Sequence, residues 1–115
     1  MMIELMLAAA APVAPPPLDP GQVFALECVA VIGLAARSDA SLTTDGREFA
    51  AVVGARIISR GYTREQVGNL ILQRGLALAA RPADAGLLTE CRTLMQATLA
   101  AAAVDAPLPP PLPRR

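Results

Sequence analysis

Apolar residues recur at intervals of three and four through most of the chain, and no segment alternates apolar and polar residues over the length of a strand. This spacing gathers apolar side chains on one face of an α-helix. Short polar or proline-containing segments interrupt the pattern and divide the chain into four helical stretches. We therefore predict an all-α fold, a small up-down four-helix bundle with helices over about 20–37, 45–60, 64–80 and 84–104.

Each predicted helix begins near a residue whose side chain can accept a hydrogen bond from a free backbone N–H. Asp19 stands before Pro20, and proline is favoured at the first helical position. The second and third starts carry Glu48 or Gln66 three residues after the cap, which is the spacing of a capping box. The predicted caps are Asp19, Asp45, Thr63 and Asp84.

The four helices differ in how their apolar residues are distributed. The first is apolar nearly all round, so it requires cover on most sides. The 64–80 helix has two apolar faces, and Gly68 and Gly75 on one of them predict the close approach of another helix. The other two helices each carry one stripe, Phe49, Val53 and Ile57 in the second and Leu87, Leu88, Cys91, Leu94, Met95, Thr98 and Leu99 in the fourth.

The two ends of the chain have a different composition from its middle. Residues 1–18 combine an apolar segment that resembles a secretory signal peptide with a proline-rich linker, although Glu4 interrupts the apolar run and no basic residue precedes it. Residues 106–115 are proline-rich and predict a disordered tail. We expect one helical domain over 19–105, with export to the periplasm or the medium, and no membrane span after processing.

Composition excludes several kinds of chemistry. The chain has no His, which removes the commonest general base and metal ligand, and its two cysteines are too far apart for a clustered metal site. We predict no catalytic residues, no cofactor and no metal. Formal net charge is zero, so we expect no nucleic-acid partner, although residues 43–81 carry six Arg against three acidic residues. This local excess favours docking of the two central helices against the more acidic outer pair.

Cys28 and Cys91 lie in the first and the last helix, which are antiparallel neighbours in an up-down bundle. Measured along the helices at about 1.5 Å per residue, their heights differ by only about 3 Å. We therefore predict a disulfide between them. The alternative is two free cysteines buried as small core residues, since cysteine is among the most buried residue types.

Two further features are candidate sites. Glu27 is the only charge between Gln22 and Ala36 of the first helix, so it is a candidate buried carboxylate, with pairing to Arg92 or Arg74 as the simpler structural role. At the turn between the second and third helices, the sequence brings together a candidate partner surface. It consists of Arg56, Arg60, Tyr62 and Arg64.

These observations favour a bacterial, exported, non-enzymatic helical module that acts through protein–protein contacts and is stabilised by one disulfide. Its apolar first helix and the second apolar face of the third also favour a homo-oligomer. The alternative is a cytosolic helical adaptor or regulator with two free buried cysteines.

Overall fold

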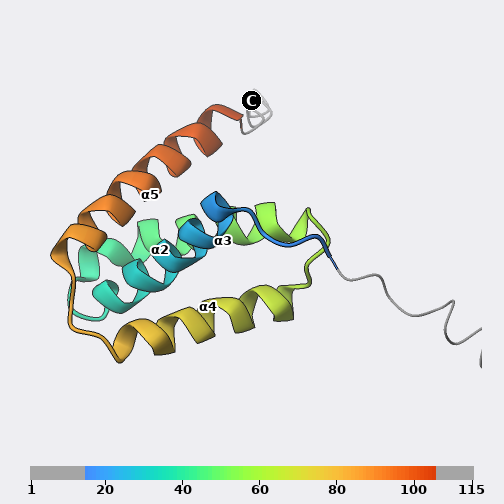
Figure 1. The fold of residues 1–115 in the computed structure, drawn as a ribbon. Coiled ribbons are helices and arrows are strands. Elements are labelled where there is room, and N and C mark those ends of the chain that lie inside the picture. The colour runs from blue at the N-terminus through green and yellow to red at the C-terminus, as the bar shows by residue number, and fades with distance from the viewer. Residues whose placement is uncertain (1–14, 106–115) are drawn as a thin grey trace, which may run out of the picture.

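A computed structural model of the chain describes residues 15–105, which form four α-helices and one short 3₁₀ helix with no strand in that range (Figure 1). The predicted all-α, up-down four-helix bundle is confirmed. The apolar segment before residue 15 and the proline-rich tail lie outside the described residues. The helices are α2 (Pro20–Ala36), η1 (Ala40–Leu42), α3 (Thr43–Ile58), α4 (Arg64–Ala79) and α5 (Ala85–Asp105).

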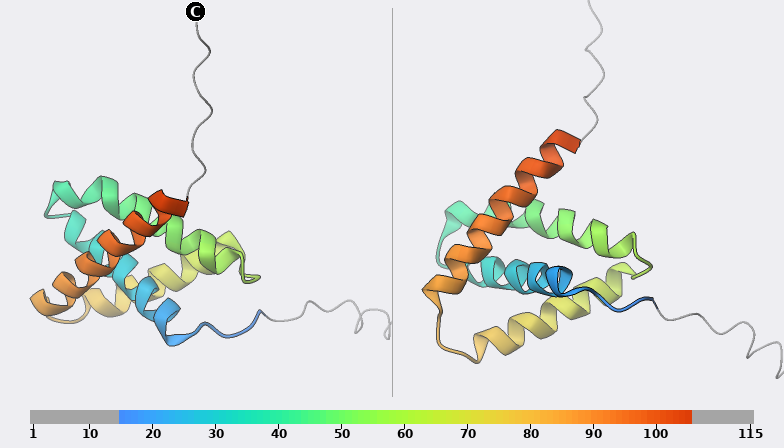
Figure 2. Two further views of the ribbon diagram at one scale, coloured as in Figure 1. Left: turned by 90° about the horizontal axis from the view of Figure 1, so that it is seen from above. Right: turned by 45° about the horizontal axis from the view of Figure 1, so that its top comes forward.

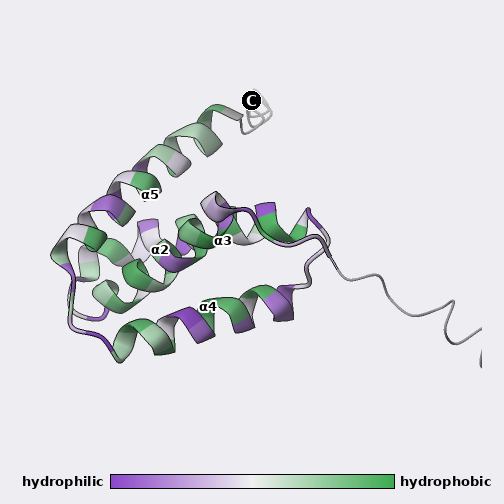
Figure 3. Cartoon of the chain, viewed as in Figure 1, coloured by the Kyte–Doolittle hydropathy of each residue, from purple (hydrophilic) through white to green (hydrophobic). Residues whose placement is uncertain are grey.

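α2 lies at the centre of the arrangement and packs against each of the other α-helices. α3 and α4 diverge from their short connection and lie on different sides of α2, while α5 crosses a third side (Figure 2). No Cα atom of α4 lies within 8 Å of one in α5. The central position explains why α2 is apolar nearly all round, a property that Figure 3 shows as green on its successive turns.

The core lies between α2, α3 and α5, and the predicted stripes of α3 and α5 both contribute to it. Phe49 is fully buried, and Cys91 and Met95 of α5 are also buried. From α4, only Val67 is buried, and this helix packs against α2 and α3 but not against α5. The buried apolar cluster comprises Leu26, Cys28, Val29, Ile32, Leu42, Phe49, Val53, Ile57, Val67, Cys91 and Met95.

Three of the four predicted caps are confirmed. The Asp19 carboxylate accepts a hydrogen bond from the Gln22 N–H at 2.8 Å, and Thr63 forms the predicted reciprocal box with Gln66. The Asp84 carboxylate accepts from the Leu87 N–H at 3.1 Å. Because these signals lie within one helical turn, they need no knowledge of the tertiary structure.

The predicted cap at Asp45 is wrong. α3 begins at Thr43, so Asp45 lies in its first turn, where a negative charge interacts favourably with the helix dipole. The segment before it forms η1, whose first turn is capped by Asp39 through the Ser41 N–H. Leu42 ends η1 and is buried in the core. Because the Leu42 side chain is buried, the chain enters α3 before the predicted start at Asp45.

The close approach predicted at Gly68 and Gly75 is also wrong. A Cβ atom added to either glycine would meet nothing within 4 Å. The close contact is at Gly46 of α3, where a Cβ would lie 3.0 Å from a methyl group of Ile32. Here the absence of a side chain lets α3 approach α2.

Candidate functional site

Cys28 of α2 and Cys91 of α5 are joined by a disulfide at the centre of the core. Their Cα atoms are 4.9 Å apart, and both residues are fully buried. The predicted proximity of the two cysteines is therefore confirmed. The bond links residues 63 positions apart and ties together two helices from opposite ends of the domain.

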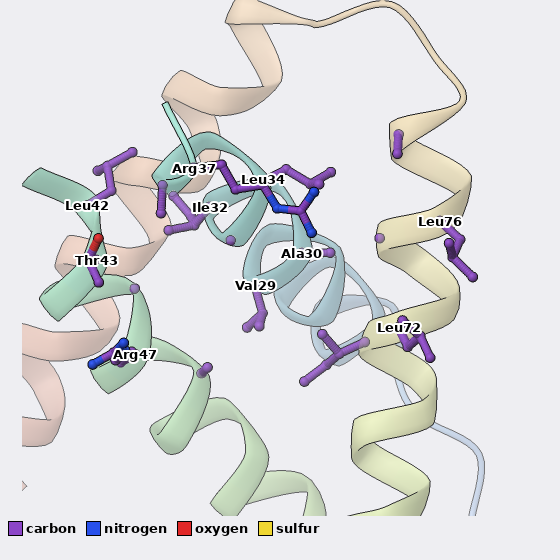
Figure 4. Close-up of a pocket in the computed structure, with 17 residues that line it drawn as sticks. Val29, Ala30, Ile32, Leu34, Arg37, Leu42, Thr43, Arg47, Leu72 and Leu76 are labelled. Atoms are coloured by element: carbon purple, nitrogen blue, oxygen red, sulfur yellow. The ribbon is translucent and has the colours of Figure 1, made fainter. Parts of the chain in front are cut away.

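An apolar groove of about 540 Å³ opens over the C-terminal half of α2, between the N-terminal turns of α3 and the C-terminal half of α4 (Figure 4). Its floor and walls consist mainly of small and aliphatic residues. They include Ala30 and Gly33 of α2, Gly46 and Ala50 of α3, and Leu72 and Leu76 of α4. We call this feature the α2 groove.

The α2 groove is open because glycines, which have no side chain, lie on its α2 floor and its α4 wall. A Cβ added at Gly33 or at Gly75 would meet no atom within 4 Å. On the α4 edge, Leu72 and Leu76 are 60% and 65% exposed, an unusual position for two leucines on one helix face. The described part of the chain thus leaves one side of its most apolar helix uncovered.

Among residues 15–105, Arg37 and Arg47 are the only charged residues that line the groove. Both lie near the connection between α2 and α3, and both are exposed. Figure 4 shows the Arg37 side chain extending toward α4, while Arg47 lies beside Thr43. In residues 15–105 neither guanidinium forms an ion pair, since the two ion pairs of this region involve Arg60 and Arg92. The groove therefore combines an apolar interior with a positive end.

The candidate partner surface at the turn between α3 and α4 is partly occupied by contacts within the chain. Arg60 lies 3.6 Å from the Asp19 carboxylate, and the Tyr62 hydroxyl donates to the Pro16 carbonyl at 3.0 Å. These contacts hold the segment before α2 against the turn. Arg56 and Arg64 are exposed, and Arg56 also lines a smaller hollow of about 200 Å³ beside the start of α2.

Glu27 is half-buried rather than enclosed, and it lines neither hollow. The predicted pairing with Arg92 or Arg74 does not form, because the two ion pairs of residues 15–105 join Arg60 to Asp19 and Arg92 to the Asp39 carboxylate, the latter at 3.2 Å. That carboxylate also accepts hydrogen bonds from the side chain and the N–H of Ser41. The Ser41 hydrogen bonds, with a smaller contribution from the Arg92 charge, hold the pKa of Asp39 below its ordinary value.

Two other properties of the described residues bear on the site. They contain no group of three or more His, Cys, Asp or Glu side chains placed to hold a metal ion. Their helices include none with the length and apolar character needed to cross a membrane.

Comparison with protein-family models, with characterised proteins and with solved structures finds no match to this chain. The fold defines the protein as a small, disulfide-bonded, all-α domain. Arg37 and Arg47 line the α2 groove, but the sequence did not predict them as site residues. Their only signal in the sequence was their place beside small residues at helical spacing.

Proposed function

We propose that this protein is an exported, non-enzymatic helical module that acts by binding another protein, with the Cys28–Cys91 disulfide as its covalent staple. The observation that supports binding is the α2 groove with its two exposed leucines, because apolar surface of this kind is typical of interaction sites. The disulfide and the signal-like start support export, since disulfides persist in oxidising compartments and are rare in the cytosol.

Export is tested by fractionating the native host and measuring the intact mass of the protein without reductant. We expect a periplasmic or secreted chain that has lost about the first ten to fourteen residues, as a signal peptide would. Its mass should be two hydrogens below that of the dithiol. An intact cytosolic chain with two alkylatable thiols would contradict export and favour the cytosolic adaptor.

Binding is tested separately by placing a photo-crosslinking amino acid at Leu76, on the edge of the groove. The matched control position is Gln96, which is exposed on α5 and does not line the groove. We expect one discrete crosslinked protein from position 76 and none from position 96. Equal or absent crosslinking at both positions would contradict a partner at this surface.

A further inference from the structure

We propose that the partner inserts an amphipathic α-helix with an acidic end into the α2 groove. This inference rests on the proposed binding function and names the chemistry of the partner. Its physical basis is the combination of an uncovered apolar floor, helical walls on both sides and two basic residues at one end.

The shape of the groove fits a helix. The groove-lining residues Ala30, Gly33 and Arg37 are spaced by three and four, so they form one ridge of α2. The lined part of α2 runs from Val29 to Arg37, which is about 12 Å or roughly two helical turns at about 1.5 Å per residue. Helix-in-groove recognition uses apolar anchors over this length, at i, i+3 or i+4, and i+7.

Small residues allow the incoming helix to approach closely. The empty space above Gly33 and Gly75 lies on two facing elements, α2 and α4. α2 is already covered by α3, α4 and α5 on its other sides. A helix in the groove would therefore complete the cover of the most apolar helix and bury Leu72 and Leu76.

Charge decides which occupant fits best. Arg37 and Arg47 line the groove, and no acidic residue of the described part of the chain lines it. A partner helix with Glu or Asp near one end would pair with these two guanidinium groups, which steers its direction in the groove. On α4 itself, Arg74 lies on the opposite side of the helix from Leu72 and Leu76, whereas Glu65 lies on their side, so a second copy is the rival occupant that the sedimentation experiment below separates from a partner helix.

The probe is a synthetic amphipathic peptide of about 16 residues, long enough to form a helix when bound. It carries Leu and Ala along one face and Glu at one end, and its twin has Lys in place of each Glu. Binding to the purified oxidised protein is measured by fluorescence anisotropy. We expect the Glu peptide to bind at least about tenfold more tightly than its twin, with a preference that weakens as salt is added.

The blocking variant is Gly33→Leu, which places a side chain in the groove where a Cβ meets no neighbour. Its matched control is Gly68→Leu, because Gly68 is also helical and also has open space around it, but does not line the groove. Both variants should keep the helical circular dichroism spectrum. We expect Gly33→Leu to weaken binding of the Glu peptide at least about tenfold and Gly68→Leu to leave it unchanged.

A second variant tests the charge argument without filling the groove. The double substitution Arg37→Glu and Arg47→Glu should reverse the preference, so that the Lys peptide binds more tightly than the Glu peptide. Arg74→Glu is the control, since Arg74 is exposed and lies outside the groove. It should leave the preference for the Glu peptide in place.

Several outcomes would overturn the proposal. Equal binding of the two peptides, or equal effects of the two glycine variants, would contradict an acidic helix in this groove. Sedimentation that shows a dimer abolished by Gly33→Leu would assign the groove to a second copy. Displacement of the Glu peptide by dodecanoate would assign it to an acyl chain. None of these results alters the crosslinking outcome at Leu76. The proposal that a partner exists and the proposal that it is an acidic helix can therefore be refuted independently.

Discussion

The Cys28–Cys91 disulfide should provide a large share of the stability of this domain. In the chain-entropy model, a bridge that closes a loop of this length stabilises the folded state by about 4 kcal/mol, because it restricts the unfolded chain. Whole domains are stable by only about 5–15 kcal/mol, and small ones bury a smaller fraction of their surface. Loss of the bridge should therefore bring the domain close to its limit of stability.

The perturbation is reduction of the wild-type protein, which removes the bridge without removing a side chain. Both cysteines are fully buried, so the sample should be unfolded in the presence of reductant and refolded before measurement. Urea unfolding at 25 °C should give a free energy of unfolding lower by about 4 kcal/mol than that of the oxidised protein. Thermal melting should fall by about 15–30 °C, from about 4–8 °C per kcal/mol in a domain of this size.

The control is the double variant Cys28→Ala and Cys91→Ala, whose stability should not respond to reductant. It should lie near or slightly below the reduced wild type, because alanine also leaves a small gap in the core. A difference of less than about 1 kcal/mol between the oxidised and reduced wild type would refute the entropic argument. An equal response of the double variant to reductant would show that the effect does not come from the bridge.

Four other substitutions test separate parts of the fold. Gly61 has a φ of 106° after α3, so Gly61→Ala should lower the free energy of unfolding in urea by about 1–3 kcal/mol. Gly68→Ala, at an exposed helical glycine, should raise it by about 0.5–1 kcal/mol. Equal effects of the two substitutions would contradict the backbone argument. Phe49→Ala should lower the free energy of unfolding by about 3–5 kcal/mol, and a loss below about 1 kcal/mol would place this side chain outside the core. Because the pKa of Asp39 is lowered in the folded state, its contribution is present above its unfolded pKa and should be lost as the pH falls below about 4 through the folded value. Asp39→Asn should flatten that part of the stability curve relative to wild type, and unchanged acid dependence would contradict the role of the Ser41 and Arg92 contacts.

The parts of the fold that could be predicted from sequence are those with local causes. Helical periodicity and capping residues act within a few positions, so the four helices and the caps at Asp19, Thr63 and Asp84 were predictable. The pairing of Cys28 with Cys91 was also within reach, because an up-down bundle fixes which helices are neighbours and their heights.

The features that could not be predicted depend on contacts between distant segments. α3 starts at Thr43 and not at the predicted Asp45, because Leu42 is buried in the core. No local sequence signal indicates that burial. The glycine that permits close packing of α3 on α2 is Gly46, because the Ile32 side chain of α2 lies directly against it. The α2 groove has the same origin, since it exists only because α3 and α4 lie on different sides of α2.

The absence of contact between α4 and α5 makes the domain mechanically uneven. α2 and α5 are covalently joined, whereas α4 is attached through packing on α2 and a few contacts near its connection to α3. Only Val67 of this helix is buried, so α4 is the element that can separate at the lowest free energy. Amide hydrogens of α4 should exchange before those of α2 and α5, as the first cooperative unit to open. Such an opening would leave α2 and α5 joined by the disulfide and remove one wall of the α2 groove, so release of the proposed partner helix would not require the domain to unfold.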